Sequence, residues 1–453
     1  MSNPKMRSPK RIIIIGGNAA GVSAAAAARK TDRYAEIIMI EADDHPAYSR
    51  CGLPFVIEGK IPRFEDLLIY PPNYYRMMKI DLRLKTTATA IDKEAKTVEI
   101  EDSHGKRDVL EYDSLILATG AYPFAPPIRG RDKMGVFTVR TLRDGGRINR
   151  AVSDAKSAVV IGAGLTGLEM AAAFARRGIR TTIVELLPQV LPAMLDEDMA
   201  ILVQEGFEKE GVEVITGHGV DEILGGDEVE GISAAGREIA ADLVIIATGV
   251  RPSVELAKEA GVEIGKTRAI KTNLRMRTSV EDIYAAGDCV ESVHMVTHAP
   301  VLSQLGTVAI RQGMVAGINA GGGYAIFPGV LGSAVSKLFD LEVGATGLTE
   351  RQAEQAGVKT VVGFTMAETR ARYYPGALPI TVKLIFEERT RRLIGGQIVG
   401  GEGVAPRMNA LSLAIQKQMT AWEMVQADTC YTPPLSDYME PSIQIAAQVA
   451  LGA

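Results

Sequence analysis

The chain has 453 residues, of which 47% are apolar and 23% are charged, and its formal net charge is -5 at pH 7. This length and composition predict a globular protein of about two to four domains. The weak negative charge gives no basic footprint for phosphate backbones, which argues against nucleic acid as a partner. No segment offers the roughly 20 uninterrupted apolar residues that a membrane-spanning helix needs.

The first recognisable unit lies at the start of the chain. A buried strand is predicted at 11–15, a glycine-rich turn at 16–21, an alanine-rich helix ending at Lys30 and a second strand at 37–41. Strand, tight turn, helix and strand in this order are typical of a dinucleotide-binding βαβ unit.

The same order occurs again further along. A strand is predicted at 158–161, a turn at 162–167, a helix to Arg177 and a strand at 181–185. The second turn begins 146 residues after the first, so the two copies are separate βαβ units.

Glycines in such a turn allow a tight bend and a close approach of the backbone to a pyrophosphate, which rests on a helix N-terminus. The second copy is complete, and Glu185 ends its second strand, where a carboxylate accepts hydrogen bonds from a ribose diol and repels a 2′-phosphate. NADH is therefore favoured over NADPH. The first copy has Asn18 at the position of the middle glycine, but Glu41 still supplies the acid.

The two units end on matching Ala-Thr-Gly strands, at 115–120 and 244–249, and a further strand at 283–288 follows the second unit. We therefore expect the second unit to interrupt the first domain. Predicted strands at 359–364 and 380–386 precede predicted helices at 405–417 and 421–426, which indicates an α+β region at the C-terminus. The fold class expected is α/β, with two Rossmann-like domains and a C-terminal α+β domain. The expected domains are 1–120 with 250–325, then 121–249, then 326–453.

Cys51 stands alone between the two fingerprints, in Ala47-Tyr-Ser-Arg-Cys-Gly-Leu-Pro54. If it lies near a helix N-terminus, the partial positive charge lowers the thiol pKa and favours the nucleophilic thiolate. The alternative is a buried structural cysteine. The flanking Ser49 and Arg50 favour a redox-active thiol.

The other cysteines, Cys289 and Cys430, form no disulfide framework with Cys51, so a reducing, cytoplasmic location is expected. Cys289 is interpreted as a packing residue, and the role of Cys430 beside Tyr431 stays open. No histidine pairs with another ligand at metal-binding spacing, so no metal site is predicted.

These features together resemble the flavin-dependent pyridine nucleotide-disulfide oxidoreductases, in the branch with a single redox cysteine. The resemblance runs through nearly the whole chain. It rests on both fingerprints and both Ala-Thr-Gly strands, and on the motifs Ala286–Asp288, Phe327–Leu331, Lys337–Leu341, Thr346–Thr349 and Tyr431–Pro434.

The resemblance implies a set of cofactor positions. Those implied for FAD are Gly16, Ala20, Gly21, Glu41, Arg50, Ala88, Ala118, Thr119, Gly120, Asp288, Leu305, Gly306 and Thr307. Those implied for NADH are Gly162, Gly164, Leu165, Thr166, Gly167, Glu169, Glu185 and Gly249. It also implies a homodimer through the C-terminal domain, with Tyr431 and one of Tyr373 and Tyr374 reaching the cysteine of the partner subunit.

The branch contains coenzyme A disulfide reductases, NAD(P)H persulfide or polysulfide reductases, and NADH oxidases and peroxidases. The oxidases and peroxidases usually carry a histidine where this chain has Ala19, which disfavours oxygen or peroxide as acceptor. The function expected is reduction of a disulfide, persulfide or polysulfide, with coenzyme A as a candidate carrier. Tyr74 replaces a lysine often used on coenzyme A phosphates, whereas Arg29, Lys30 and Arg33 could contact them. A flavoprotein electron carrier for a protein partner is the remaining alternative.

Overall fold

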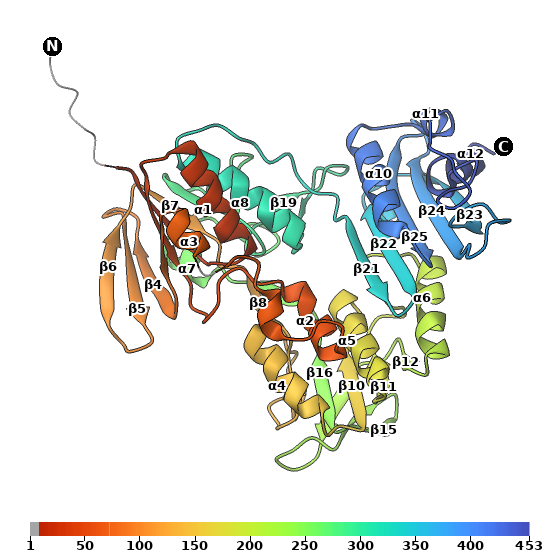
Figure 1. The fold of residues 1–453 in the computed structure, drawn as a ribbon, viewed down its shortest axis with the longest axis horizontal. Helices are drawn as coiled ribbons and strands as arrows, with labels where there is room; N and C mark the ends of the chain where they lie inside the picture. Colours follow the sequence, from red (N-terminus) through yellow and green to blue (C-terminus); the bar gives the residue numbers. More distant parts are fainter. Residues whose placement is uncertain (1–8, 72, 453) are drawn as a thin grey trace.

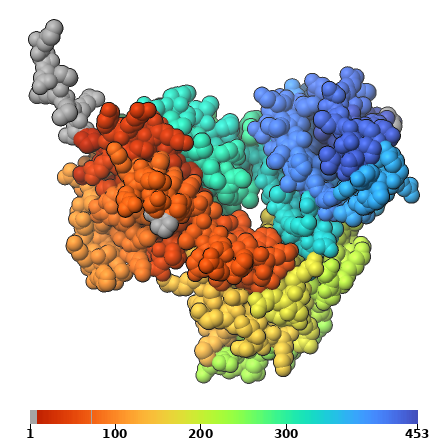
Figure 2. Space-filling view, viewed as in Figure 1, coloured from red at the N-terminus to blue at the C-terminus, as the bar shows by residue number. Residues whose placement is uncertain are grey.

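The structure is a computed structural model and describes residues 9–71 and 73–452. Figure 1 shows three bodies: one built around β7 (Ser114–Leu117) and α8 (Gly306–Ala320), one around β10 (Ser157–Ile161) and β16 (Leu243–Ile246), and one formed by the C-terminal residues. The C-terminal residues, blue in Figure 2, form a separate lobe. Within the described ranges no helix is long and apolar enough to cross a membrane.

The first body is a parallel sheet covered by two helices. Its strands, in spatial order, are β18 (Ile283–Ala285), β7 (Ser114–Leu117), β1 (Arg11–Ile15), β2 (Glu36–Ile40) and β3 (Ile80–Arg83). Runs of isoleucine fill these strands because both faces are buried, as in parallel sheets in general. An antiparallel sheet of β4 (Thr86–Asp92), β5 (Thr97–Asp102) and β6 (Arg107–Glu111) follows β3.

Helices α1 (Ala19–Thr31) and α8 (Gly306–Ala320) pack very closely against each other. A Cβ atom built on Gly313 would lie 2.2 Å from the carbonyl oxygen of Ala20, and one on Gly317 would lie 2.1 Å from that of Ala24. Only glycine permits this approach, so the contact fixes the start of α8 relative to the start of α1.

The second body repeats the first. Its sheet, in spatial order, is β12 (Glu213–Ile215), β11 (Arg180–Val184), β10 (Ser157–Ile161), β16 (Leu243–Ile246) and β9 (Val136–Phe137). Its helices are α4 (Leu142–Val152), α5 (Leu165–Arg176) and α6 (Glu197–Lys209), and its antiparallel sheet is β13 (Val220–Leu224), β14 (Gly231–Ala234) and β15 (Arg237–Ala240).

The chain enters and leaves the second body through two paired strands, β8 (Ala121–Pro123) and β17 (Val250–Pro252). At each end of the inserted domain, the threonine of an Ala-Thr-Gly segment forms a hydrogen bond to the chain segment that crosses at the other end. The hydroxyl of Thr119 donates to the carbonyl of Ser253 at 2.7 Å, and that of Thr248 donates to the carbonyl of Phe124 at 2.6 Å. The crossing is thus symmetric, like the two domains that it joins.

Short elements complete these two bodies. They are the 3-10 turns at Arg50–Gly52 and Phe64–Leu67, the helices α2 (Leu53–Glu58), α3 (Tyr74–Met77) and α7 (Glu255–Glu259), and the strand pair β19 (Ser292–Val293) and β20 (Pro300–Val301).

The C-terminal body is an antiparallel sheet with helices on it. Its strands, in spatial order, are β21 (Ala334–Leu338), β22 (Leu341–Gly347), β25 (Leu393–Gly400), β24 (Pro379–Glu387) and β23 (Thr360–Glu368). Its helices are α9 (Glu350–Gln355), α10 (Val404–Gln416), α11 (Ala421–Val425) and α12 (Ala446–Ala450), with a π-helical turn at Pro441–Ile445. The α/β fold class with a C-terminal α+β domain, predicted from the sequence, is confirmed.

A buried lysine joins the C-terminal body to the second one. Lys383 of β24 is only 3% exposed, and its ammonium lies 2.8 Å from Asp198 and 3.4 Å from Asp196, at the start of α6. Glu350 is a third carboxylate, at 2.5 Å. A cation shared among three carboxylates fixes the two bodies to each other.

Candidate active site

The two glycine-rich turns have nearly the same geometry. Gly16 and Gly162 adopt φ values of +108° and +104°, which L-residues with a side chain rarely adopt. A Cβ on Gly16 would lie 2.2 Å from the carbonyl oxygen of Ala118, and one on Gly162 would lie 2.6 Å from that of Ala247. Each turn therefore presses against the strand that ends in Ala-Thr-Gly.

The third glycine of each turn packs against the first. A Cβ on Gly21 would lie 1.8 Å from the carbonyl oxygen of Gly16, and one on Gly167 would lie 2.0 Å from that of Gly162. The middle glycine, Gly164, has nothing within 4 Å of its Cβ position, so a pyrophosphate has room to approach the backbone there. In the first turn Asn18 holds this place, and its side chain accepts a hydrogen bond from the amide of Ala19 at 2.7 Å.

The two predicted ribose acids are held in the same way. Glu41 accepts hydrogen bonds from the amides of Gly17 (2.6 Å) and Asp43 (2.8 Å). Glu185 accepts them from Ala163 (2.7 Å) and Leu187 (2.8 Å), and it is 9% exposed. These bonds fix each carboxylate beside its turn and leave lone pairs for a ribose diol.

Asp288, predicted to hold the flavin ribitol, forms an ion pair that the sequence did not reveal. Its carboxylate lies 2.7 Å from Nη2 of Arg140, and the two side chains are 16% and 17% exposed. Burial lowers the pKa of Arg140, and the positive charge of Arg50 lowers it further. Among the described residues, the buried Nε atoms of Arg50 and Arg140 have no hydrogen-bond partner. Two unpaired donors near Asp288 fit a site that binds a group rich in hydrogen-bond acceptors.

The helix N-terminus at α8 lies next to this pair. The amide side chain of Gln304 donates to the carbonyl of Asp288 at 3.3 Å, and Gln312 accepts from the amide of Gly287 at 2.9 Å. Leu305 caps the helix, while Gly306 and Thr307 are exposed in its first turn. The first-turn amides of α8 are thus available to a ligand near Asp288.

The other positions implied for cofactors are more dispersed. Gly120 and Gly249 have φ values of +69° and +101° at the domain crossing, and Thr166 is exposed in the first turn of α5 beside Leu165. Ala20 is buried in the first turn of α1. Ala88 lies at a register shift of β4 and packs against the core of the first body.

Cys51 is exposed and lies in the 3-10 turn that runs directly into α2. Desolvation of the thiol raises its pKa, the carboxylate of Glu169 raises it further, and Arg140 acts in the opposite direction. The expected lowering of the pKa is therefore not found. The physical reason is that α2 has six residues and begins two positions after the cysteine, so its dipole is weak beside these charges.

Glu169 of α5, whose charge acts on this thiol, forms a hydrogen bond between the second body and the C-terminal body. Its Oε1 accepts a hydrogen bond from the hydroxyl of Ser336 on β21 at 2.7 Å. Burial raises the pKa of Glu169, and the hydrogen bond from Ser336 opposes that rise. The Cys51 thiol is thus influenced both by a carboxylate with a raised pKa and by the Arg140–Asp288 pair.

The tyrosines predicted to act on the partner subunit form a group of their own. The hydroxyls of Tyr373 and Tyr431 lie 2.5 Å apart, and the ring of Tyr438 stacks on Tyr431 with centroids 4.2 Å apart. All three side chains are exposed, whereas Tyr374 makes no contact with this group in the described interactions. Tyr373 follows β23 and the other two tyrosines follow α11, and Figure 1 shows β23 and α11 in a body separate from α2. The chain does not bring the tyrosines to its own Cys51.

The basic residues at the end of α1 have a structural use. The guanidinium of Arg29 donates to the carbonyls of Met78 (2.9 Å), Ala35 (2.7 Å) and Lys79 (2.8 Å), so it is occupied within the protein. Contact of Arg29, Lys30 and Arg33 with coenzyme A phosphates, suggested from the sequence, stays a prediction. At the neighbouring surface Tyr74 stacks on Tyr70 with ring centroids 4.1 Å apart.

Sequence models of known families match almost the whole chain. The model described as pyridine nucleotide-disulphide oxidoreductase matches residues 10–313, and that of the dimerisation domain of the same family matches residues 333–443. The chain belongs to this family. The resemblance stated from the sequence is confirmed, and so are the predicted cofactors, FAD and NADH or NADPH.

Three relatives show how far the likeness extends. The chain is 46% identical to a protein of Methanocaldococcus jannaschii named NADH oxidase, over 97% of this chain and 98% of that protein. It is 38% identical to a CoA-dependent NAD(P)H sulfur oxidoreductase of Pyrococcus furiosus, over 96% of this chain and 98% of that protein. A solved structure of an NAD-dependent persulfide reductase from A. fulgidus has a TM-score of 0.95 and 40% identity, over 98% of this chain and 83% of that one.

Proposed function

We propose that this protein uses NADH to reduce a disulfide, persulfide or polysulfide through the single thiol of Cys51. The observation that carries the proposal is the position of this thiol. It is exposed and feels the charges of Glu169, on the helix that follows the second glycine-rich turn, and of the Arg140–Asp288 pair beside the start of α8. The sulfur and persulfide reductases among the relatives support the same acceptor class.

The residues around both glycine-rich turns fit the two cofactors. For FAD the proposed contacts are the first turn, Glu41, Asp288 and the amides that open α8; for NADH they are the second turn, Glu185 and Gly249. When bound, FAD supplies the two-electron relay between NADH and sulfur. Exposed Leu186 and Leu187 follow Glu185 and offer no cation for a 2′-phosphate, which supports NADH as the preferred donor.

The chain's own part in the reaction centres on sulfur exchange. The Cys51 thiolate attacks one sulfur of the acceptor, a new S–S bond forms to Cys51, and the other sulfur leaves with the bonding pair and takes up a proton. Two electrons that originate from NADH then cleave the new bond, which restores the Cys51 thiolate and releases the bound sulfur as a second thiolate that takes up a proton. Burial raises the pKa of Glu169, which favours its protonated form, and we propose this carboxyl as the proton donor to the departing sulfur.

We further propose a homodimer in which Tyr431 and Tyr373 act at the Cys51 site of the partner subunit. The dimerisation domain and the separation of these tyrosines from Cys51 within one chain support this arrangement. Coenzyme A is the proposed carrier of the sulfur, supported by the CoA-dependent relative. Three free cysteines support a reducing, cytoplasmic location.

The test is anaerobic oxidation of NADH by the FAD-loaded protein with coenzyme A persulfide as acceptor. Cys51→Ser should abolish turnover while NADH still reduces the bound FAD, and the matched variant Cys430→Ser should retain turnover. Persistence of turnover without Cys51 would contradict the proposal.

A second candidate is an NADH oxidase, because the 46% identical relative carries that name. Ala19 in the first turn has no titratable side chain to assist oxygen chemistry. Comparing NADH oxidation in air with anaerobic turnover on the persulfide separates the two. Faster turnover with oxygen alone would favour the oxidase.

A further inference from the structure

The tyrosine group is assembled from two chain segments that are far apart in the sequence. Tyr373 lies in the loop between β23 and β24, whereas Tyr431 and Tyr438 lie in the segment between α11 and the π-helical turn. The hydroxyl contact between Tyr373 and Tyr431 is the point where these segments meet. Because all three rings are exposed, their own packing cannot fix this geometry.

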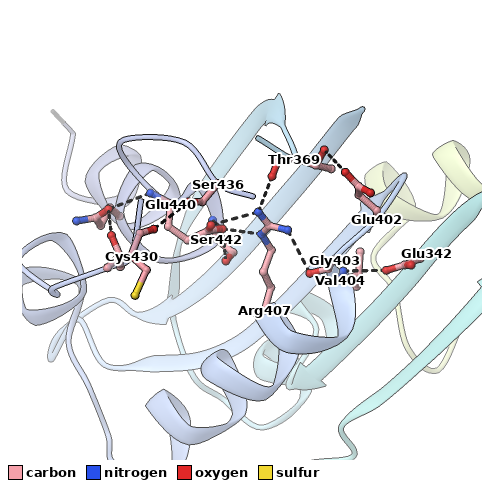
Figure 3. A network of polar contacts seen from close by, with 12 residues as sticks. Glu342, Thr369, Glu402, Gly403, Val404, Arg407, Cys430, Ser436, Glu440 and Ser442 are labelled. Carbon is pink, nitrogen blue, oxygen red and sulfur yellow. Dashed lines mark hydrogen bonds and ion pairs between the residues drawn. The ribbon is translucent and has the colours of Figure 1, made fainter. Parts of the chain in front are cut away.

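Arg407, near the start of α10, connects the two segments (Figure 3). Its Nε donates to Glu440 at 2.7 Å and its Nη2 donates to the same carboxylate at 3.2 Å, which makes a two-point ion pair. The same Nη2 donates to the carbonyl of Thr369 at 3.0 Å. Glu440 follows Tyr438 by two residues, and Thr369 precedes Tyr373 by four. One guanidinium therefore holds both tyrosine segments.

The ion pair is shielded from solvent, since the side chains of Arg407 and Glu440 are 11% and 13% exposed. Glu440 is fixed further by the hydroxyl of Ser442 at 2.9 Å. A well-ordered, desolvated pair of this kind holds its geometry better than an exposed pair does. It can therefore serve as a rigid support for the exposed tyrosine group.

A second connection runs beside the first. The amide of Ala371 donates to the carbonyl of Ser436 at 3.2 Å, and the hydroxyl of Ser436 donates to the carbonyl of Cys430 at 3.0 Å. The first bond joins the two segments, the second fixes Ser436 within its own segment, and neither involves a charge. Arg407 is the charged, buried part of the assembly.

The hydrogen bonds in the tyrosine group shift the pKa values of its hydroxyls in opposite directions. Hydrogen bonding with Tyr373 and Tyr438 raises the pKa of Tyr431, and hydrogen bonds from Tyr431 and Tyr373 lower the pKa of Tyr438. This inequality depends on the relative positions of the two segments. A shift of either segment removes it.

We propose that Arg407 is a positioning residue that, through Glu440 and Thr369, holds Tyr373, Tyr431 and Tyr438 as one unit facing the sulfur acceptor at the partner subunit's Cys51. This inference rests on the proposed function, because the unit is useful only if it meets an acceptor. Arg407 itself contacts neither acceptor nor cofactor. It acts through the tyrosines, and misplacement of a reacting group by about 1 Å can lower a rate on the order of 100-fold.

The experiment compares Arg407→Met and Glu440→Ala with Glu342→Ala in the FAD-loaded protein. Glu342 is a matched control because its carboxylate also contacts the start of α10, at the amide of Val404 (2.9 Å), but touches neither tyrosine segment. Three quantities are measured: the rate at which NADH reduces FAD, kcat and KM for coenzyme A persulfide, and the ultraviolet difference spectrum of tyrosine ionisation across pH.

We expect Arg407→Met and Glu440→Ala to reduce kcat/KM for the acceptor at least about tenfold while NADH reduces FAD at the wild-type rate. In both variants Tyr438 should lose the hydrogen bonds that lower its pKa, so its ionisation should shift to higher pH. Glu342→Ala should match the wild type in all three measurements. An equal loss in Glu342→Ala, or an unchanged ionisation curve in Arg407→Met, would overturn the proposal.

Failure of the proposed function has a different signature. In that case the wild type itself shows no Cys51-dependent turnover with the persulfide, whereas the ionisation curve still reports whether Arg407 orders the tyrosines. An altered curve in Arg407→Met then supports the positioning role without the acceptor.

Discussion

The second glycine-rich turn allows a test that separates folding from cofactor binding, using two single-methyl substitutions three residues apart. In Gly167→Ala the new Cβ meets the carbonyl oxygen of Gly162 at 2.0 Å, and ordinary contact at about 3.4 Å requires a shift of about 1.4 Å. In Gly164→Ala the new Cβ meets nothing within 4 Å. Without a bound cofactor, the protein therefore tolerates Gly164→Ala but not Gly167→Ala.

The magnitudes follow from this difference. Overpacking against backbone costs about 1–3 kcal/mol, and replacing a helical glycine by alanine returns about 1 kcal/mol. Gly167→Ala should thus destabilise the protein by up to about 2 kcal/mol. Gly164 is the N-cap of α5, where alanine is less favourable than glycine by less than about 1 kcal/mol.

Binding should show the reverse order. A methyl group on Gly164 occupies the space through which the pyrophosphate reaches the backbone amides. Loss of one hydrogen bond to a charged group, about 1.5–3 kcal/mol, weakens NADH binding by roughly 10- to 100-fold.

The assay pairs pulse proteolysis in urea with the NADH concentration dependence of FAD reduction. If Gly164→Ala proved as unstable as Gly167→Ala while binding NADH normally, the roles assigned to the two glycines would be wrong.

The remaining predictions concern two charged groups. Glu169→Gln should lower the pKa of the Cys51 thiol, because Glu169 has the largest effect among the charged groups that raise it. The pH profile of thiol alkylation in a Cys430→Ser background measures this pKa. An unchanged profile would contradict the prediction. Since burial raises the pKa of Glu169 above 4.5, its carboxyl favours the folded state below that pH, and this contribution is lost as pH rises through the folded-state pKa. Glu169→Gln should therefore gain stability relative to the wild type as the pH rises through that range, measured as the difference in urea midpoints. Lys383→Met should destabilise the protein by about 2–3 kcal/mol because it leaves the buried carboxylate of Asp196 without its cation. A loss of stability under about 0.5 kcal/mol would show that water solvates Asp196, Asp198 and Glu350 once Lys383 is removed.

The parts of the site that could be predicted are those written in short stretches of sequence. The glycine-rich turns, Glu41 and Glu185 follow from local rules of backbone conformation, and strands such as 11–15 follow from their apolar runs. The α/β fold class could be inferred because the same local order occurs twice.

The parts that were missed depend on contacts between distant residues. Arg140 lies 148 residues from Asp288, and Ser336 lies 167 residues from Glu169, so no local pattern joins them. Tyr438 is recognisable only from its stacking on Tyr431. The structural use of Arg29 was also missed, because its carbonyl partners at Met78 and Ala35 come from other parts of the chain.

The paired strands β8 and β17 place the two ends of the inserted domain next to each other, with Val250 opposite Pro123. A unit whose ends are neighbours can be removed or replaced without rerouting the rest of the chain. For protein engineers it defines an exchangeable cassette, provided that the grafted domain keeps Arg140, which pairs with Asp288 of the host, and Glu169, which bonds to Ser336 of the C-terminal body.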